Sequence, residues 1–143
     1  MRQRSKVMGF SLVEILLVLA ILGIISGIAI PSFLGQRRRA RIIGDAQSNA
    51  QVLRMQLESR KADTGVYGAP AATCTWTASG GIPSGSNNLA PTFLPKGNSK
   101  MNYTLTMGST GHAYTLTVND PSMAGSPIAF QTNQNGEVLK KME

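Results

Sequence analysis

The sequence predicts an α+β protein in which one long N-terminal helix packs on a small antiparallel sheet of three to four strands. Three observations support this fold class. An uncharged, largely apolar run extends over 22 residues, from Ile15 to Gln36. Apolar residues at spacings of three and four follow it, which is typical of an amphipathic helix. The segment 101–143 then alternates bulky with small or polar side chains, which is typical of strands.

The first element is a membrane-spanning or assembly helix over residues 10–36. At about 1.5 Å per residue, the uncharged run spans about 33 Å as a helix, close to a bilayer core of about 30 Å. An ordinary secretory signal has a shorter apolar region of about 7–15 residues and ends at a small-residue cleavage site. Glu14 also lies within the apolar segment, where such a signal carries no charge. The sequence therefore favours an anchor over a cleaved secretory signal.

Small residues recur inside this helix at Gly23, Gly27 and Pro31. The first two form a GxxxG pair, which lets helix backbones approach closely in lipid. Proline removes one backbone hydrogen bond, and each glycine lowers helix stability by up to about 1 kcal/mol. We therefore predict that the helix is most easily unwound between Gly23 and Pro31.

The second element is the amphipathic half of the same helix, over residues 37–64. One face is predicted to be apolar and to cover the downstream strands; it consists of Ile43, Ala46, Ala50, Leu53 and Leu57. The pattern ends at Asp63–Gly65, and Gly65 suits a left-handed cap. The sequence thus predicts one helix from Phe10 to about Ala62.

Residues 65–100 are rich in Gly, Pro, Ser and Asn, so they are predicted to form a long loop. Short helical or strand pieces are expected around Thr73–Thr77 and Leu89–Leu94. Trp76 is interpreted as an anchor that pins the loop to the core. Cys74 is the only cysteine, so it cannot form a disulfide within the chain.

The last element, residues 101–143, is predicted to be the sheet. Four strands are expected, at Met101–Met107, Ala113–Val118, Pro127–Thr132 and Glu137–Lys141, with turns at Gly108–Gly111 and before Gly136. The side chains predicted to face the helix are Tyr103, Leu105, Met107, Tyr114, Leu116, Val118, Ile128 and Phe130.

The formal net charge of +7 raises the question of nucleic-acid binding. Ten of the 14 basic residues lie in the first 61 residues and flank the apolar run, however, and the chain from Gly65 onward carries a net charge of only +1 (four Lys against three acids). The basic residues include a cluster of Arg37, Arg38, Arg39 and Arg41. The basic residues therefore flank a membrane segment, where the arginine cluster is interpreted as solvated or facing lipid headgroups, and no nucleic-acid partner is expected.

Residues with catalytic chemistry are few. The single histidine, His112, could form a nucleophilic set with Cys74 and Asp120 only by chance, since nothing in their spacing supports it. No zinc-type Cys/His pairs or phosphate-binding glycine loop occurs in the sequence. Asp120 precedes a proline, and a metal-free turn is favoured there over a calcium site, which needs several oxygen ligands. We expect no catalytic residue, no metal and no cofactor, and hence no enzyme.

The string GFSLVEILLVLAILGIISGIAIP, from Gly9 to Pro31, resembles the prepilin signature of type IV pilins and type II secretion pseudopilins. The resemblance implies that residues 1–9 are a leader, that a prepilin peptidase cuts between Gly9 and Phe10, and that the new Phe10 amine is methylated. It also implies that subunits pack their N-terminal helices into a filament. Glu14 would then pair with the Phe10 amine of an adjacent subunit, which would offset the cost of burying a carboxylate.

The resemblance further implies an inner-membrane precursor with a cytoplasmic N-terminus, drawn by inner-membrane machinery into a cell-surface or periplasmic filament. Charge counting alone does not fix this orientation, because both flanks of the apolar run are basic. The filament could be a pilus or the pseudopilus of a secretion system; the stretch ADTGVYG after the helix is similar to the major pseudopilin. A membrane-anchored periplasmic binding domain is the alternative of another class, and it would make the Gly9–Phe10 junction and Glu14 accidental.

Overall fold

A computed structural model describes residues 9–80, 88–97 and 100–142 of the chain. Most of the predicted leader, part of the predicted loop and the last residue lie outside the described residues. The chain divides into two compact units, Met1–Arg38 and Arg39–Glu143, and each is described by itself.

Helix α1 extends over Leu12–Thr64, two residues later at each end than predicted. In the first unit it presents only exposed side chains. In the second unit it buries one face, which consists of Ile42, Ala46, Asn49, Ala50, Leu53 and Leu57. The prediction for Ile43 was wrong, because the helix is rotated so that Ile42 is buried and Ile43 is half-buried. The predicted cap is confirmed: Gly65 has φ of 82° and its N–H donates to the Lys61 carbonyl over 2.8 Å.

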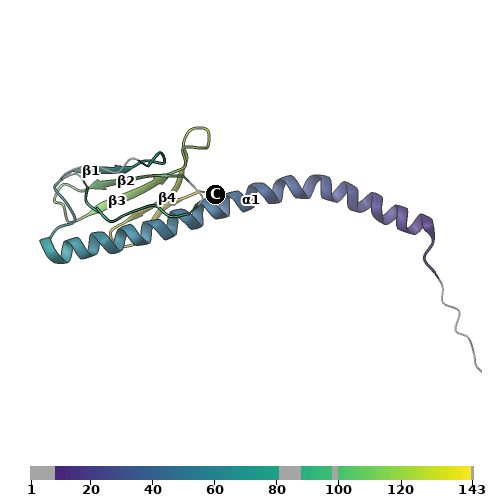
Figure 1. The fold of residues 1–143 in the computed structure, drawn as a ribbon, viewed down its shortest axis with the longest axis horizontal. Helices are drawn as coiled ribbons and strands as arrows, with labels where there is room; N and C mark the ends of the chain where they lie inside the picture. The colour runs from purple at the N-terminus through teal and green to yellow at the C-terminus, as the bar shows by residue number, and fades with distance from the viewer. Residues whose placement is uncertain (1–8, 81–87, 98–99, 143) are drawn as a thin grey trace, which may run out of the picture. The chain divides into compact units, whose positions relative to one another are not determined.

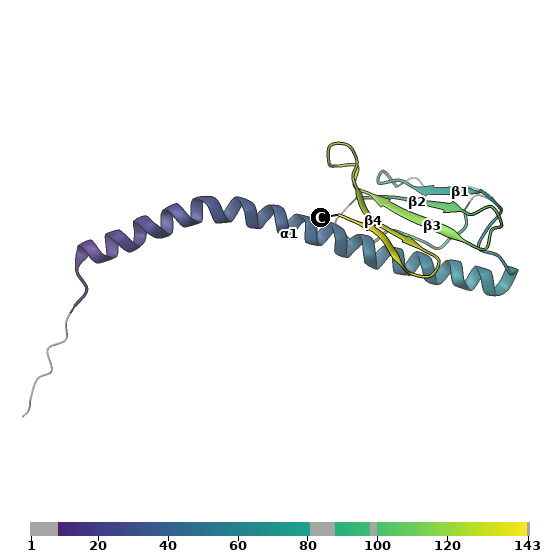
Figure 2. The same ribbon diagram turned by 180° about the vertical axis from the view of Figure 1, so that it is seen from behind.

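The sheet of the second unit has five antiparallel strands in the order β1-β2-β3-β4-β5, one more than the three to four predicted (Figure 1). The strands are β1 (Thr73–Trp76), β2 (Asn102–Met107), β3 (Tyr114–Asn119), β4 (Ile128–Asn133) and β5 (Val138–Lys141). The additional strand is β1, which lies within the predicted loop at one of the two places where a short strand piece was expected. Both views show the second half of α1 lying along one face of this sheet (Figures 1 and 2).

Side chains along the strands alternate between the two faces of the sheet, as the sequence predicted, and the bulky ones face the helix. Cys74 pairs with Leu105, and Leu105 pairs with Leu116, so buried residues form rows across the sheet. The opposite face carries threonines at the intervening positions of β1, β2 and β3, a β-branched residue that favours strands. These are Thr73, Thr75, Thr104, Thr106, Thr115 and Thr117.

Ile128 is the one predicted inward residue that is not buried. The register between β3 and β4 shifts between Val118 and Asn119, which adds a residue to β4 at this point. A bulge of this kind interrupts the alternation of faces. Ala129 and Phe130 are therefore both buried, and Ile128 is only half-buried.

Trp76 is buried, as expected of an anchor, and it holds part of the segment that follows β1. Its ring meets Phe93 in a T-shaped contact with centroids 5.3 Å apart, and Phe93 meets Tyr103 in the same way at 5.4 Å. Edge-to-face pairs of this kind stabilise a core beyond their buried area. Around Leu89–Leu94, where a helical or strand piece was expected, the described backbone forms a turn, and its side chains Leu89, Ala90 and Phe93 are buried.

Asn49 is a polar residue on the buried face of α1, and it connects three elements of the second unit. Its amide nitrogen donates to the Tyr103 hydroxyl over 2.8 Å and to the Lys96 carbonyl over 2.7 Å. Its amide oxygen accepts from the Lys96 N–H over 2.9 Å. The side chain therefore joins the helix to β2 and to the segment that ends in residues 96–97. Leaving a buried amide of this kind without hydrogen bonds lowers the stability of the fold.

The pKa values of the three tyrosines indicate how the stability of the second unit changes at alkaline pH. Burial raises the pKa of Tyr103 to about 12, and burial also raises the pKa of Tyr67 and of Tyr114. Because the pKa of Tyr103 in the folded chain lies above its ordinary value of 10.0, its contribution to stability is complete below pH 10 and is lost as the pH rises through about 12. We expect tyrosinate absorbance to appear together with loss of native Trp76 fluorescence in alkaline titration of the whole chain in detergent. Tyrosinate appearing near pH 10 with unchanged Trp76 emission would contradict this expectation.

Candidate functional site

The predicted cleavage junction lies just before the helix. Gly9 and Phe10 are both exposed and outside regular secondary structure, and the Phe10 side chain is 80% exposed. An added Cβ on Gly9 would meet nothing within 4 Å among the described residues. Proteases act most readily on exposed, non-helical backbone near chain ends. The structure therefore places the Gly9–Phe10 bond where a peptidase could reach it.

Glu14 lies in the first turn of α1, four residues after Phe10. The carbonyl of Ser11 accepts from the N–H groups of Glu14 and Ile15, over 3.1 and 3.3 Å, so Ser11 is at the N-cap position. A carboxylate in the first turn is favoured by the helix dipole. Within the described residues, no hydrogen bond or ion pair involves the Glu14 side chain. Its carboxylate is thus exposed and available to a group from outside the subunit.

Ser11 is the residue of this site that the sequence analysis missed. Ser11 and Glu14 have the S-x-x-E spacing of a capping box, in which the two residues satisfy backbone N–H groups at a helix start. That spacing is visible in the sequence. It gives Glu14 a second possible role, local capping, which an experiment must separate from pairing between subunits.

The apolar half of α1 is exposed, and none of the described residues covers it. All described side chains of α1 up to Arg41 are exposed. An 18-residue window in α1 reaches a mean hydropathy of 2.7 with none of its side chains buried, and by length and composition this is the one candidate membrane span within the described residues. Exposed apolar surface on this scale marks a membrane or protein interface. The exposed apolar half of α1 is therefore consistent with a membrane anchor.

Gly23, Gly27 and Pro31 all lie within the continuous helix. An added Cβ at either glycine would meet nothing within 4 Å of the described atoms, so no contact inside the subunit explains the absence of a side chain there. The predicted ease of unwinding between Gly23 and Pro31 stays a prediction for the assembled state.

The three residues considered for nucleophilic chemistry are not brought together. His112 precedes β3 and Asp120 follows it, so a six-residue strand of about 20 Å separates them. Cys74 is buried in β1, and burial raises the pKa of its thiol. Asp120 is buried, and its Oδ1 accepts from the backbone N–H and the hydroxyl of Ser122, which forms a turn at the Asp–Pro sequence. Among the described residues, no three His, Cys, Asp or Glu side chains lie close enough to hold a metal ion.

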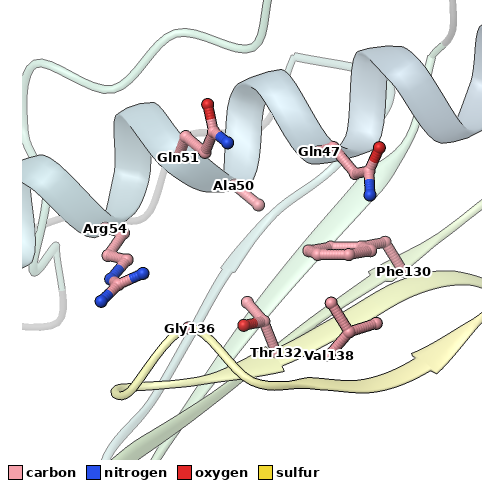
Figure 3. Close-up of a pocket in the computed structure, with 8 residues that line it drawn as sticks. All are labelled: Gln47, Ala50, Gln51, Arg54, Phe130, Thr132, Gly136 and Val138. Atoms are coloured by element: carbon pink, nitrogen blue, oxygen red, sulfur yellow. The ribbon is translucent and has the colours of Figure 1, made fainter.

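A groove lies between the second half of α1 and the β4–β5 hairpin, with a volume of about 150 Å³ (Figure 3). Phe130, Val138 and Ala50 form its apolar part, and Arg54 closes one end near Gly136. Its size and mixed lining suit a few water molecules better than an organic ligand, since ligand pockets usually exceed about 300 Å³.

Comparison with known proteins identifies one matching family model, the prokaryotic N-terminal methylation motif, at residues 4–30. This motif is the prepilin-type signature of type IV pilins and pseudopilins, and the resemblance drawn from the sequence is thereby confirmed. No curated protein and no solved structure matches the chain. The motif and the single apolar helix on an α+β head support, in general terms, a type IV pilin-like or pseudopilin protein.

Proposed function

We propose that this protein is a structural subunit of a type IV pilus or pilus-like filament, not an enzyme. The single observation that carries the proposal is the coincidence of the methylation motif with Glu14 in the first part of α1, which is otherwise largely apolar up to Gln36 and fully exposed among the described residues. A carboxylate in such a segment is costly in lipid, by about 2.5–3.5 kcal/mol at a helix centre, and typically has a function.

The proposed life cycle has three steps. The precursor is held in the inner membrane by residues 10–36 with its N-terminus in the cytoplasm. Prepilin peptidase removes residues 1–9 and the Phe10 amine is methylated. Inner-membrane machinery then moves the subunit into a filament, in which Glu14 pairs with the Phe10 amine of a neighbouring copy. The pair neutralises both charges and fixes the axial position of one helix against the next.

Processing is tested by Gly9→Val. We expect this variant to retain all 143 residues, whereas the unmodified chain loses nine residues and gains one methyl group, because the larger side chain at the cleavage site prevents cleavage. Intact-mass spectrometry of the membrane fraction measures both. Gly27→Val is the matched control, since an added Cβ is equally unobstructed at that glycine and lies far from the junction.

The same measurement separates the proposal from the alternative of a membrane-anchored periplasmic binding domain. An unmodified chain that keeps its N-terminus, or is cut at another bond, would support the binding domain and contradict the filament subunit. Normal processing of Gly9→Val would show that the peptidase does not act at this junction.

Pilus and pseudopilus differ in where the filament is found. A pilus subunit is expected in fibres on the cell surface, visible by electron microscopy of a tagged copy. A pseudopilin of a type II secretion system is expected instead to form no fibres on the cell surface. When its gene is deleted, proteins that are normally secreted should remain inside the cell. We favour a pilus or pilus-like subunit, because the long Gly/Pro/Ser-rich segment 65–100 suits a loop that faces the exterior.

A further inference from the structure

Exposed basic side chains gather at one end of the second unit. We call this the anchor-proximal end, because it is where α1 arrives from the apolar run: it comprises residues 39–49 of the helix with the strand and loop ends beside them. Six exposed basic residues belong to it, namely Arg39, Arg41, Lys96, Lys100, Lys140 and Lys141.

Contacts within the second unit bring the two loop lysines to this end. The backbone of Lys96 makes two hydrogen bonds with Asn49, of 2.7 and 2.9 Å, so this residue lies beside the helix. Lys100 is three residues before Tyr103, whose hydroxyl also bonds Asn49. Both lysines therefore lie near Asn49, at the end of the segment 39–49 that is about 15 Å along the helix from Arg39.

Strand β5 brings the other two lysines to the same end. Lys141 pairs with Phe130 in the sheet. Phe130 lies opposite Gln47 across the groove, whereas Gly136, at the other end of the hairpin, lies beside Arg54 (Figure 3). Strand β5 therefore runs from the level of Arg54 toward the level of Gln47. Its last residues, Lys140 and Lys141, lie near the segment 39–49 of α1.

The two ends of the unit differ in charge. The anchor-proximal end carries six basic residues and two acidic residues, Asp45 and Asp120, so its net charge is 6 − 2 = +4. Of the two acidic residues, Asp120 is buried. The other end has three basic and three acidic residues, so its net charge is 3 − 3 = 0. The basic residues are Arg54, Arg60 and Lys61, and the acidic residues are Glu58, Asp63 and Glu137. Both counts cover the described residues of the second unit only.

We propose that the anchor-proximal end is a binding surface for anionic phospholipid headgroups of the bilayer that holds the precursor. Arg39 and Arg41 follow the apolar run by three and five residues, within about 8 Å along the helix, so they lie at headgroup depth when the run spans the membrane. Basic residues beside a membrane are attracted to anionic lipids within a Debye length of about 8–10 Å. The four lysines add positive charge at the same end of the unit, beyond that of the arginines.

The proposal rests on the membrane anchoring of the precursor and not on filament assembly. It assigns the lysines a role before assembly, in which they hold the second unit against the membrane surface. Acidic surfaces of neighbouring subunits are the competing partner, and the experiment distinguishes the two.

The test uses the full chain in nanodiscs of phosphatidylcholine alone or with phosphatidylglycerol. An uncharged amine-reactive reagent is added, and mass spectrometry gives the acylation rate of each lysine. We expect Lys96, Lys100, Lys140 and Lys141 to react about fivefold more slowly in the anionic bilayer, the factor that corresponds to about 1 kcal/mol per basic residue. Lys61, at the opposite end, is the internal control, and its rate should be the same in both bilayers.

High salt should remove the protection, because the attraction is screened. Equal rates in the two bilayers, or equal slowing of all five lysines, would overturn the proposal. Protection found only in assembled filaments would overturn it in favour of neighbouring subunits. The readout does not depend on filament formation, so its failure is distinct from failure of the proposed function.

Discussion

Replacement of Glu14 by glutamine is expected to leave the chain inserted and cleaved but to exclude it from filaments. Loss of the carboxylate would leave the Phe10 amine of the neighbouring subunit buried without a counter-ion. Breaking a buried pair in this way costs about 3–5 kcal/mol, which corresponds to more than about a hundredfold in the affinity of a subunit for the filament. Glu14→Val removes the same charge and should behave alike. The measurement is the amount of subunit in sheared filaments against the amount of processed subunit in membranes.

Glutamine also separates pairing between subunits from local capping, the second role that the S-x-x-E spacing suggests for Glu14. A capping box accepts Gln as well as Glu at this position, so Glu14→Gln keeps the capacity for local capping while removing the charge. Ser11→Ala is the matched control, because it removes the cap side chain and keeps the carboxylate. If Glu14 acts by pairing, Ser11→Ala should assemble and Glu14→Gln should not. Filaments of normal abundance and length from Glu14→Gln would refute the pairing.

Much of the fold was predictable because its elements have regular periods. The bounds of α1 were within two residues of the prediction, since an uncharged run and an amphipathic pattern follow one another without a break. Strands β2 to β5 were predicted within one residue at each end, because each alternates between turns rich in Gly, Asn or Asp.

The remaining features depend on residues that are distant in the sequence. Strand β1 has only four residues, and it pairs with β2 across a connection of 25 residues, from Thr77 to Met101. Its local pattern predicts a strand weakly, and its stability comes from pairing with β2 and from burial of Trp76. Asn49 was not predicted to be buried because its partners Lys96 and Tyr103 are 47 and 54 positions away. The bulge that buries Ala129 likewise arises from pairing with β3, which no local pattern encodes.

The candidate site could be proposed from the sequence for a different reason. Gly9, Phe10 and Glu14 form a linear motif whose parts lie within six consecutive residues, so no folding is needed to bring them together. The second unit shows the opposite case, because the lysines of the anchor-proximal end are up to 45 residues apart in the sequence and share a location only through the sheet. A functional site at the N-terminus can thus be proposed from the sequence, whereas the charge distribution of the second unit requires the structure.

The largest effect on stability is expected from Asn49→Leu. Leucine has the same branched arrangement of side-chain heavy atoms but makes none of the three hydrogen bonds of Asn49, and it leaves the buried Tyr103 hydroxyl without its amide partner. At about 1 kcal/mol for each net hydrogen bond and about 1–3 kcal/mol for an unsatisfied buried group, the free energy of unfolding should fall by about 4–6 kcal/mol. Denaturant unfolding of the whole chain in detergent, followed by fluorescence of Trp76, measures the second unit alone because the chain has a single tryptophan.

Ser48→Ala is the matched control, since Ser48 is the exposed neighbour of Asn49 on the same helix, and it should change stability by no more than about 0.5 kcal/mol. A second variant tests the mechanism. Tyr103→Phe removes the other partner of the buried bond, so the double variant should be more stable than the sum of the single effects predicts. Additive effects of Asn49→Leu and Tyr103→Phe, or an Asn49→Leu effect no larger than that of Ser48→Ala, would show that this hydrogen bond does not hold the helix to the sheet.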